Sequence, residues 1–259
     1  MPSTDWGYLV TPEEFASWIL SQDDTVIAVN KPGGLVCHPS KRGPWSSLIG
    51  AAREFLGTAQ LHMPSRLDRE TSGVVVFARN AQAASRLQTA IAKRQVRKEY
   101  LAIVEGRFDQ PVTVDQPIGP VEGALVYNRQ GVTATGRASI THFEPVSASN
   151  RFSVVRALPE TGRLHQIRVH AAWLGHPVVG DKVYGPDERL FLDFIRTGFT
   201  TDMVPHLHLP RHALHASQIE FPGEPCWRAP WPEELARFCR DHALPEVDCG
   251  YRGRCVAGR

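Results

Sequence analysis

Apolar and polar residues follow two different spacings along the chain, one typical of helices and the other of strands. The segment Thr11-Pro12-Glu13-Glu14 places a capping hydroxyl, a proline and a carboxylate where a helix begins. Phe15, Trp18 and Ile19 follow as an apolar stripe at helical spacing. We therefore predict a helix that starts after Thr11 and carries this stripe.

Runs rich in β-branched residues, bounded by glycine or proline, predict the strands of the fold. These runs cover residues 25–32, 73–80, 98–106, 137–146, 151–158 and 214–221. Further helices are predicted over residues 81–94 and 161–175 and from Pro232 onward. Because strands and helices do not alternate regularly, the pattern favours an α+β fold with a largely antiparallel sheet.

The composition is that of an ordinary globular protein. The 259 residues are 42% hydrophobic and carry a net charge of +2. No apolar run approaches the roughly 18–20 residues that span a bilayer, and the first residues do not form a signal peptide, so we expect a cytoplasmic protein. Without an export signal, the cysteines are expected to be reduced thiols. Their irregular spacing, with no Cys-x-x-Cys pair, argues against a metal site. The five cysteines are Cys37, Cys226, Cys239, Cys249 and Cys255.

A polar loop, Arg66-Leu67-Asp68-Arg69-Glu70-Thr71-Ser72-Gly73, leads directly into the strand predicted over 73–80. Asp68 lies between two arginines, and Thr71 and Ser72 supply hydrogen-bond donors. Positive charge and donors favour an ionised carboxylate, which can act as a nucleophile or a base. A capped turn uses the same residue types, and spacing alone favours that alternative.

A second polar segment is Arg163-Leu164-His165-Gln166-Ile167-Arg168-Val169-His170. On a helix, His165 and Arg168 would share one face. Gln166 and His170, four residues apart, would also share a face. So many polar side chains beside apolar neighbours indicate a lined cleft, and the alternative is a surface helix with solvated charges. Two histidines five residues apart do not match the usual helical metal pair.

The third segment, Arg94-Gln95-Val96-Arg97-Lys98-Glu99-Tyr100, combines cations with an aromatic ring. Such cations can neutralise phosphates, and a tyrosine ring can stack on a base. The alternatives are ordinary, because basic helix ends suit the helix dipole and a tyrosine inside a strand is by default a core residue.

Five stretches together closely resemble the RluA-type family of RNA pseudouridine synthases, in the order in which the family has them. They are VNKPGGLVCHP (29–39), RLDRETSGVVVFAR (66–79), RKEYLAIVEG (97–106), TGRLHQIRVHAAWLGHPVVGDKVYG (161–185) and RHALHASQIEFP (211–222). The combination of RLDRETSG with GRLHQIRVH is far more specific than a short single motif.

The resemblance implies a bent, mainly antiparallel sheet flanked by helices, with an RNA-binding cleft across it. By motif position, Asp68 matches the essential aspartate, and Arg168 matches the arginine that pairs with its carboxylate. Tyr100 matches the tyrosine that stacks on the target base and helps to move a proton. Arg66 would enter the RNA stack as the base leaves it, and Leu214 would pack near the target uracil. Further substrate contacts are expected from Leu67, Thr71, His165 and Gln166.

Two features depart from the family pattern. Ser65 stands where members usually have a histidine, and we expect this to alter loop packing or RNA contacts more than the chemistry. Many members also carry a small N-terminal RNA-binding domain, for which the residues before the first strand are too few. We therefore expect an extension with a short helix over 1–24, a catalytic domain over 25–222, and a C-terminal helix and tail over 223–259.

The implied activity is isomerisation of uridine to pseudouridine in rRNA or tRNA, by a monomer with RNA as its partner. The reaction gains and loses no atoms, so we expect no cofactor and no metal. Two alternatives use the same residues. One is a non-catalytic RNA-binding or RNA-folding protein, and the other is a hydrolase that cleaves N-glycosidic bonds.

Overall fold

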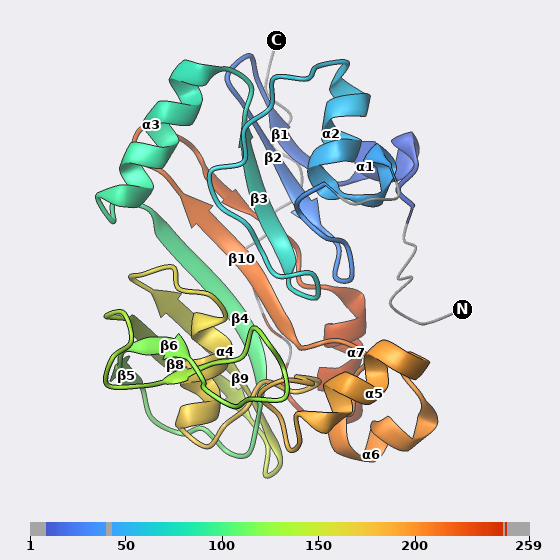
Figure 1. Cartoon of the computed structure of the whole chain (residues 1–259), viewed down its shortest axis with the longest axis vertical. Helices are drawn as coiled ribbons and strands as arrows, with labels where there is room; N and C mark the ends of the chain where they lie inside the picture. Colours follow the sequence, from blue (N-terminus) through green and yellow to red (C-terminus); the bar gives the residue numbers. More distant parts are fainter. Residues whose placement is uncertain (1–8, 40–42, 246, 248–259) are drawn as a thin grey trace. The chain divides into compact units, whose positions relative to one another are not determined.

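The computed structural model describes residues 9–39, 43–245 and 247, which fall into two compact units. The Asp68 unit comprises Gly7–Lys98 and His215–Trp231. The Arg168 unit comprises Glu99–Leu214 and Pro232–Val247. Each unit contains its own strands (Figure 1). Each also has its own hydrophobic clusters.

The sheet of the Asp68 unit is mostly antiparallel. Its strands are β1 (Ile19–Gln22), β2 (Val26–Lys31), β3 (Ser72–Ala78), β10 (Leu214–Glu220) and β11 (Cys226–Arg228). The pairs β1–β2, β2–β3 and β10–β11 are antiparallel, whereas β3 and β10 pair in parallel through His215 opposite Ser72. The parallel pair brings the end of the Asp68 loop next to His215 and Ala216.

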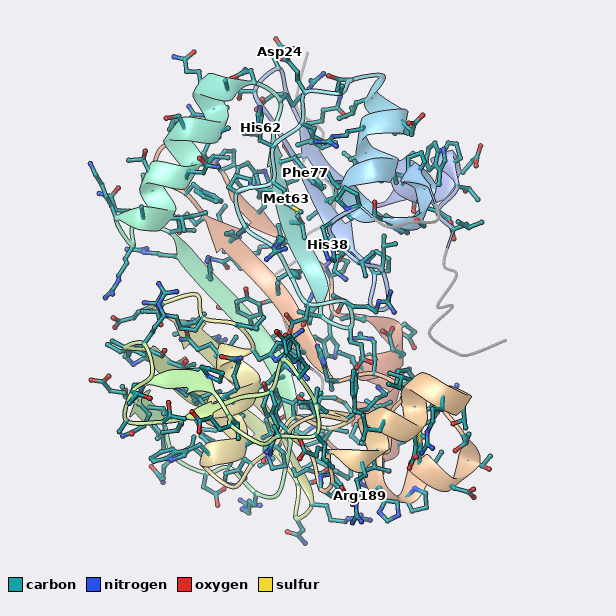
Figure 2. The ribbon with its side chains drawn as sticks, viewed as in Figure 1. Asp24, His38, His62, Met63, Phe77 and Arg189 are labelled. Atoms are coloured by element: carbon teal, nitrogen blue, oxygen red, sulfur yellow. The ribbon has the colours of Figure 1, made fainter. Side chains whose placement is uncertain are left out.

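Both faces of this sheet are buried. On one face, Ile27, Val29 and Phe77 pack with α1 (Pro12–Ser17) and α2 (Leu48–Leu56), and Met63 adds to this cluster (Figure 2). On the other face, alternate residues of β2 and β3 pack against α3 (Ala81–Ala92) (Figure 1). Burial on both faces explains the uninterrupted apolar runs that mark these strands in the sequence.

Two helices of this unit, α1 and α3, begin where the sequence predicted them, and each begins at a side-chain cap. Thr11 and Glu14 form a reciprocal capping box at the start of α1. The Asn80 side chain accepts a hydrogen bond from the Ala83 backbone N–H (2.9 Å) and starts α3. The predicted apolar stripe is divided, however, because α1 ends at Ser17 and Ile19 begins β1.

The Arg168 unit has an antiparallel sheet in the order β4-β9-β8-β5, and β6 and β7 form a separate hairpin. Its strands are β4 (Arg97–Glu105), β5 (Val112–Asp115), β6 (Ile118–Pro120), β7 (Gln130–Val132), β8 (Ile140–Ala148) and β9 (Phe152–Pro159). Its helices are α4 (Gln166–Trp173), α5 (Arg189–Thr197), α6 (Val204–Leu207) and α7 (Glu233–Asp241). Phe152 of β9 packs against Phe238 of α7, with ring centroids 5.1 Å apart.

The predicted fold class is therefore confirmed, with a mainly antiparallel arrangement of strands and interspersed helices. Helices α2 and α5 were not among the predicted elements. The helix predicted over 161–175 begins only at Gln166.

In the part of the chain that the structure describes, no helix is long and apolar enough to cross a membrane. The same residues contain no group of three His, Cys, Asp or Glu side chains that could hold a metal ion. Cys37 is a free and buried thiol. Cys249 and Cys255 lie outside the described residues.

A histidine buried among cations lies in the core of the Arg168 unit. Burial lowers the pKa of His212 well below its ordinary value, and the positive charges of Arg168, Lys182 and Arg211 lower it further. A histidine in such surroundings is neutral in the folded protein at pH values where the unfolded chain takes up a proton.

Gly73, the second residue of β3, stands opposite Ala216 of β10. Its φ of +113° lies in a region that side chains rarely adopt, and a Cβ at this position would be 2.2 Å from the carbonyl oxygen of Ala216. Only glycine allows the two strands to pair this closely directly after the Asp68 loop.

Replacing Gly73 with alanine should lower the free energy of unfolding by about 2–5 kcal/mol, because overpacking and backbone strain add. Urea unfolding followed by circular dichroism measures this. The matched control is Gly34→Ala, since Gly34 also has a positive φ (+92°) but an added methyl group there would meet no atom within 4 Å. Equal unfolding midpoints for the two variants would contradict the proposed close contact.

The neutral state of His212 predicts a pH dependence of stability. Its folded-state pKa is lowered, so the unfolded chain binds the extra proton first, and the free energy of unfolding should fall as the pH drops below about 6.5. For one such group the loss between pH 7.5 and 5.5 is about 1.4 kcal/mol. His212→Gln should flatten the slope by that amount in urea titrations. The exposed His206, replaced in the same way, is the control, and an unchanged slope in His212→Gln would refute the assignment.

Candidate catalytic site

Asp68 lies in a loop that precedes β3 and belongs to the Asp68 unit. Its side chain is half-buried, while the neighbouring Arg66 is exposed. The backbone N–H of Thr71 donates to the Asp68 carbonyl oxygen (3.2 Å), which closes a tight turn around the carboxylate. The loop therefore presents Asp68 from a short, constrained turn and not from an extended segment.

Lys31, at the end of β2, anchors this loop through hydrogen bonds from its side chain. Its side chain is fully buried, and its ammonium donates to the carbonyl oxygens of Pro32 (2.8 Å), Leu35 (2.9 Å) and Arg69 (2.9 Å). The backbone N–H of Gly34 also donates to the Arg69 carbonyl (2.9 Å). The carbonyl oxygen of Arg69, the residue directly after Asp68, therefore accepts two hydrogen bonds.

The other end of the loop is held by a buried histidine. The Ser72 hydroxyl lies 2.9 Å from Nδ1 of His215, and Nε2 of His215 lies 3.4 Å from the carbonyl oxygen of Ala229. A carbonyl can only accept, so Nε2 carries a hydrogen, and in the neutral ring the Ser72 hydroxyl donates to Nδ1. This bond adds a side-chain link to the parallel β3–β10 pairing.

Cys37 lies beside the loop as well. Burial raises the pKa of its thiol, the charge of Lys31 opposes that effect, and the charge of Asp68 adds to it. The thiol is therefore a neutral core group close to the candidate carboxylate, and it is not an activated nucleophile.

Tyr100 and Leu214 come from the Arg168 unit. Tyr100 stands opposite Ala157 in the β4–β9 pair and is half-buried. Leu214 is the first residue of β10 and is buried.

His165 does not lie on the helix with Arg168, as the spacing argument assumed. Its backbone is left-handed (φ 57°, ψ 17°), and α4 starts at the next residue. Nδ1 of His165 lies 2.8 Å from the Tyr184 hydroxyl. The pairing of faces predicted from helical spacing is therefore wrong for His165.

The polar residues of α4 face inward, which excludes the alternative of a solvated surface helix. Gln166 and His170 are buried. The Gln166 amide nitrogen donates to Thr141 Oγ1 (2.9 Å) and to the Ile140 carbonyl (2.8 Å). Its amide oxygen accepts from the Thr161 hydroxyl (2.7 Å) and the Arg163 backbone N–H (3.0 Å). These four bonds use the full hydrogen-bonding capacity of the amide.

Arg168 forms a buried bidentate pair with Asp181. Its Nε donates to Asp181 Oδ2 (2.6 Å) and its Nη2 to Oδ1 (2.8 Å). Burial alone would raise the pKa of the Asp181 carboxyl, but Arg168 and the backbone N–H groups of Tyr184 and Val183 outweigh it and lower the pKa. The pair fixes the plane of the guanidinium.

The predicted site residues are thus divided between the units. Arg66, Leu67, Asp68 and Thr71 belong to the Asp68 unit, whereas Tyr100, His165, Gln166, Arg168 and Leu214 belong to the Arg168 unit. Sequence reasoning did not single out Lys31, His215, Asp181 or Tyr184. Each of them stands inside one of the five motif stretches, but none shows a spacing that distinguishes a buried polar role from a surface one.

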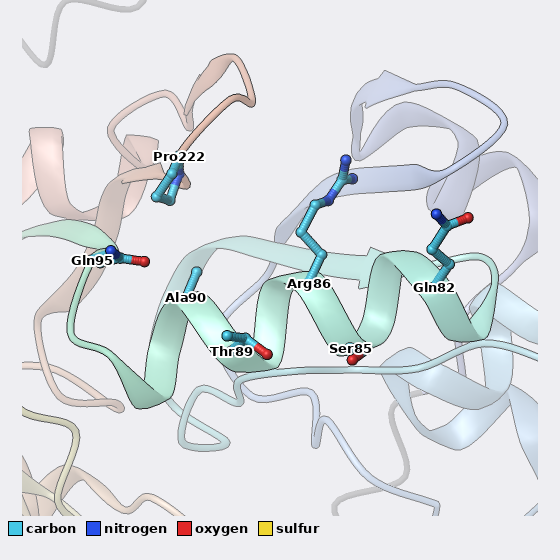
Figure 3. Close-up of a pocket in the computed structure, with 7 residues that line it drawn as sticks. All are labelled: Gln82, Ser85, Arg86, Thr89, Ala90, Gln95 and Pro222. Carbon is cyan, nitrogen blue, oxygen red and sulfur yellow. The ribbon is translucent and has the colours of Figure 1, made fainter.

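A pocket of about 540 Å³ lies elsewhere in the Asp68 unit, along the outer side of α3 (Figure 3). Gln82, Arg86, Gln95 and Pro222 are among the residues that line it. Arg86 is paired with Glu224. None of the predicted site residues lines this pocket, so the site cannot be identified from pocket size.

Residues 25–173 match the family model described as RNA pseudouridylate synthase. A ribosomal large subunit pseudouridine synthase D of Nitrosomonas europaea is 34% identical over 84% of the chain, which spans 63% of that relative. The enzyme of the same name from Vibrio vulnificus is 33% identical over 88% of the chain and 73% of the relative.

A solved structure, Human RNA Pseudouridylate Synthase Domain Containing 4, superposes with a TM-score of 0.73. It is 25% identical, and the match covers 92% of this chain and 97% of that one. The region that matches the family contains the Asp68 loop, Tyr100 and α4. The expected family and its isomerase class are confirmed: the chain belongs to the RNA pseudouridylate synthase family.

Proposed function

We propose that this chain converts uridine in RNA to pseudouridine and that Asp68 is its reactive carboxylate. The observation that carries the proposal is the position of Asp68 in the RLDRETSG motif, half-exposed on a turn held by Lys31 on one side and by His215 on the other. Reactive groups need such rigid support, because small displacements of a catalytic group cost large factors in rate.

The chemistry balances within one nucleotide. The bond between uracil N1 and ribose C1′ breaks, a bond between C5 and C1′ forms, the proton on C5 leaves, and N1 takes up a proton. Asp68 adds to the base, adds to the ribose, or removes a ribose proton, and each of these routes needs its ionised form.

The target base must first leave the RNA stack, at a cost of roughly a few kcal/mol. We propose that the exposed Arg66 occupies the vacated position and that Tyr100 stacks on the extruded uracil and helps to move the C5 proton. Leu67, Thr71 and Leu214 complete the proposed contacts with the nucleotide. The expected pairing of Arg168 with Asp68 joins residues of different units and stays a prediction.

Gln166 receives a different proposed role. Its four hydrogen bonds lie within the protein, which supports a positioning role for this residue. We propose that it holds the start of α4, so that His165 and Arg168 are presented correctly. His165 remains among the proposed substrate contacts.

The choice of RNA is part of the proposal. Two relatives are named ribosomal large subunit pseudouridine synthase D, which favours rRNA over tRNA as the substrate. A cytoplasmic location, a monomeric state and a reaction without cofactor stay predictions. Mapping of pseudouridine in rRNA and tRNA from a deletion strain identifies the target.

Asp68→Asn should reduce pseudouridine formation by about 10⁴-fold or more, because it removes the charge and keeps the shape of the side chain. RNA affinity should stay close to that of the wild type. Tritium release from C5-labelled transcripts measures the reaction, and a filter-binding assay measures affinity. Asp24→Asn, on an exposed aspartate, is the control. Near wild-type tritium release from Asp68→Asn would rule out the assignment.

Tyr100→Phe keeps the ring for stacking and removes the hydroxyl, so turnover should slow by about 100-fold with little change in RNA affinity. Single-turnover kinetics at saturating enzyme isolates the chemical step. Tyr127→Phe is the matched control, because the Tyr127 side chain is 97% exposed. Equal single-turnover rates for wild type and Tyr100→Phe would remove any role for the hydroxyl.

The same assays separate the alternatives. A non-catalytic RNA-binding protein would release no tritium and would leave the RNA unchanged. A hydrolase would produce free uracil and an abasic site, which chromatography of the products distinguishes from an isomerised nucleotide.

A further inference from the structure

The cations of one segment of the Asp68 unit have no role in the proposed reaction. Residues 71–98 contain six lysines and arginines and no aspartate or glutamate, although the whole chain carries a net charge of only +2. The segment comprises β3, α3 and the start of β4, and all of it belongs to the Asp68 unit. Because the rest of the chain has more carboxylates than cations, positive charge is concentrated on this part of one unit.

Two of these cations lie at the end of α3 without a counter-ion. Lys93 is the C-cap residue of the helix, Arg94 follows it, and both are exposed. Among the residues that the structure describes, neither side chain has a hydrogen-bond or ion-pair partner. Their charge is therefore available to an anion from outside the chain.

Two further cations, on α3 and at the start of β4, have carboxylate neighbours. Arg86 pairs with Glu224, and Arg97 lies 3.9 Å from a carboxylate oxygen of Glu220. The Arg97 side chain is 85% exposed, and water weakens a surface pair at this distance, so Arg97 keeps most of its attraction for other anions. We call Lys93, Arg94 and Arg97 the α3-end patch.

The backbone at Arg94 is unusual for an arginine. The N–H of Arg94 donates to the Ile91 carbonyl (3.0 Å) and the N–H of Gln95 to the Ala90 carbonyl (2.9 Å), and Arg94 has a φ of +55°. Glycine is the usual residue at this point of a helix end, because side chains disfavour the left-handed conformation. The helix dipole favours a cation here, but Lys93 already supplies one. The second cation therefore occupies a position that local stability would give to glycine.

Polar side chains continue the patch along the helix. Gln82, Arg86 and Thr89 line the pocket of about 540 Å³ on the outer side of α3, and Gln95 lies at the opposite end from Gln82 (Figure 3). Helical periodicity places Lys93 one turn beyond Thr89, on the same face. Amides and hydroxyls contact phosphate and sugar oxygens in nucleic-acid complexes alongside cations. The patch and the pocket thus form one polar surface that carries uncompensated positive charge.

The composition of this surface indicates the kind of partner that it fits. The large hydrophobic side chains that are exposed in the described part of the chain all lie outside residues 71–98. A protein interface needs apolar or aromatic residues in its buried centre, whereas a phosphate backbone is bound by cations and hydrogen-bond donors. The surface therefore matches a nucleic-acid backbone better than an acidic protein.

We propose that the α3-end patch and the polar pocket beside it bind the phosphate backbone of the substrate RNA, away from the target nucleotide. This inference rests on the proposed function, since the RNA is the one that carries the target uridine. Helix α3 follows β3 and runs back along it within the same unit (Figure 1). The seven residues of β3 extend about 23 Å, a distance that one RNA stem spans between the patch and the Asp68 loop.

A double substitution tests the proposal. Lys93→Gln removes one charge, and Arg94→Gly removes another while giving the left-handed position the residue that it prefers. The double variant should therefore melt no lower than the wild type. Its affinity for an in vitro transcript of large-subunit rRNA should fall about tenfold, and the salt dependence of log K should weaken by about 1.5–2 in slope, because two phosphate contacts are lost. Filter binding over a salt series measures both.

The matched control removes two exposed cations of the Arg168 unit. Arg196→Gln combined with Arg237→Gln loses the same net charge and should keep the wild-type salt slope. Single-turnover rates at saturating enzyme should equal the wild-type rate in both double variants, because the patch does not contact the reacting nucleotide. An unchanged slope in the patch variant would leave the patch to another acidic partner and overturn the proposal, as would an equal loss in the control.

The binding measurements do not depend on catalysis. If the wild type makes no pseudouridine, the proposed function fails, and the salt slopes still show whether the patch binds RNA. If the wild type makes pseudouridine while the patch variant binds RNA as the wild type does, only the present inference fails.

Discussion

The geometry of the Asp68 loop depends on one buried ammonium group. Lys31 gives hydrogen bonds to three backbone carbonyls, one of which belongs to Arg69, the residue after Asp68. Burying an ammonium group costs several kcal/mol unless its hydrogens are satisfied, so the loop can take only conformations that bring these carbonyls to it. Lys31 is also opposite Gly73 in the β2–β3 register, and the same strand pair therefore determines where the loop ends.

In the Arg168 unit, too, a buried charged side chain positions a candidate site residue, but that charge is negative. There the buried cation is itself proposed to act, and a buried carboxylate, Asp181, holds it through two parallel hydrogen bonds. A bidentate pair fixes the plane of a guanidinium as well as its position. Asp181 also accepts the backbone N–H groups of Val183 and Tyr184, so Arg168 and Tyr184 are positioned from one carboxylate.

The sequence predicted much of the fold, because local signals were strong where elements are buried on one or two faces. The capping box at Thr11 and the apolar runs of β2 and β3 are examples. It could not predict that α4 begins at Gln166, because the glycine and the polar residues before it are compatible with helix as well as turn. The bond between His165 and Tyr184, which supports the left-handed residue, is a tertiary contact that the local sequence does not reveal.

The candidate site, like the fold, was predicted only in part from the sequence. Motif positions predicted Asp68, Tyr100 and Arg168, whose chemistry is legible from residue type. Lys31 and Asp181 were missed, because a charged residue in a sequence is by default a surface residue. Their role depends on burial, which follows from strands and loops that are distant in the chain.

The start of α4 is held in place although the side chain of His165, its N-cap residue, makes no capping hydrogen bond. The helix has no side-chain cap from its N-cap residue, because the ring of His165 is directed to Tyr184. The Gln166 side chain instead ties the segment before the helix to the first helical residue, since its amide oxygen accepts the backbone N–H of Arg163. The two bonds that its amide nitrogen donates tie it to β8. The first turn of the helix is thus anchored to the sheet through a buried side chain of its first residue.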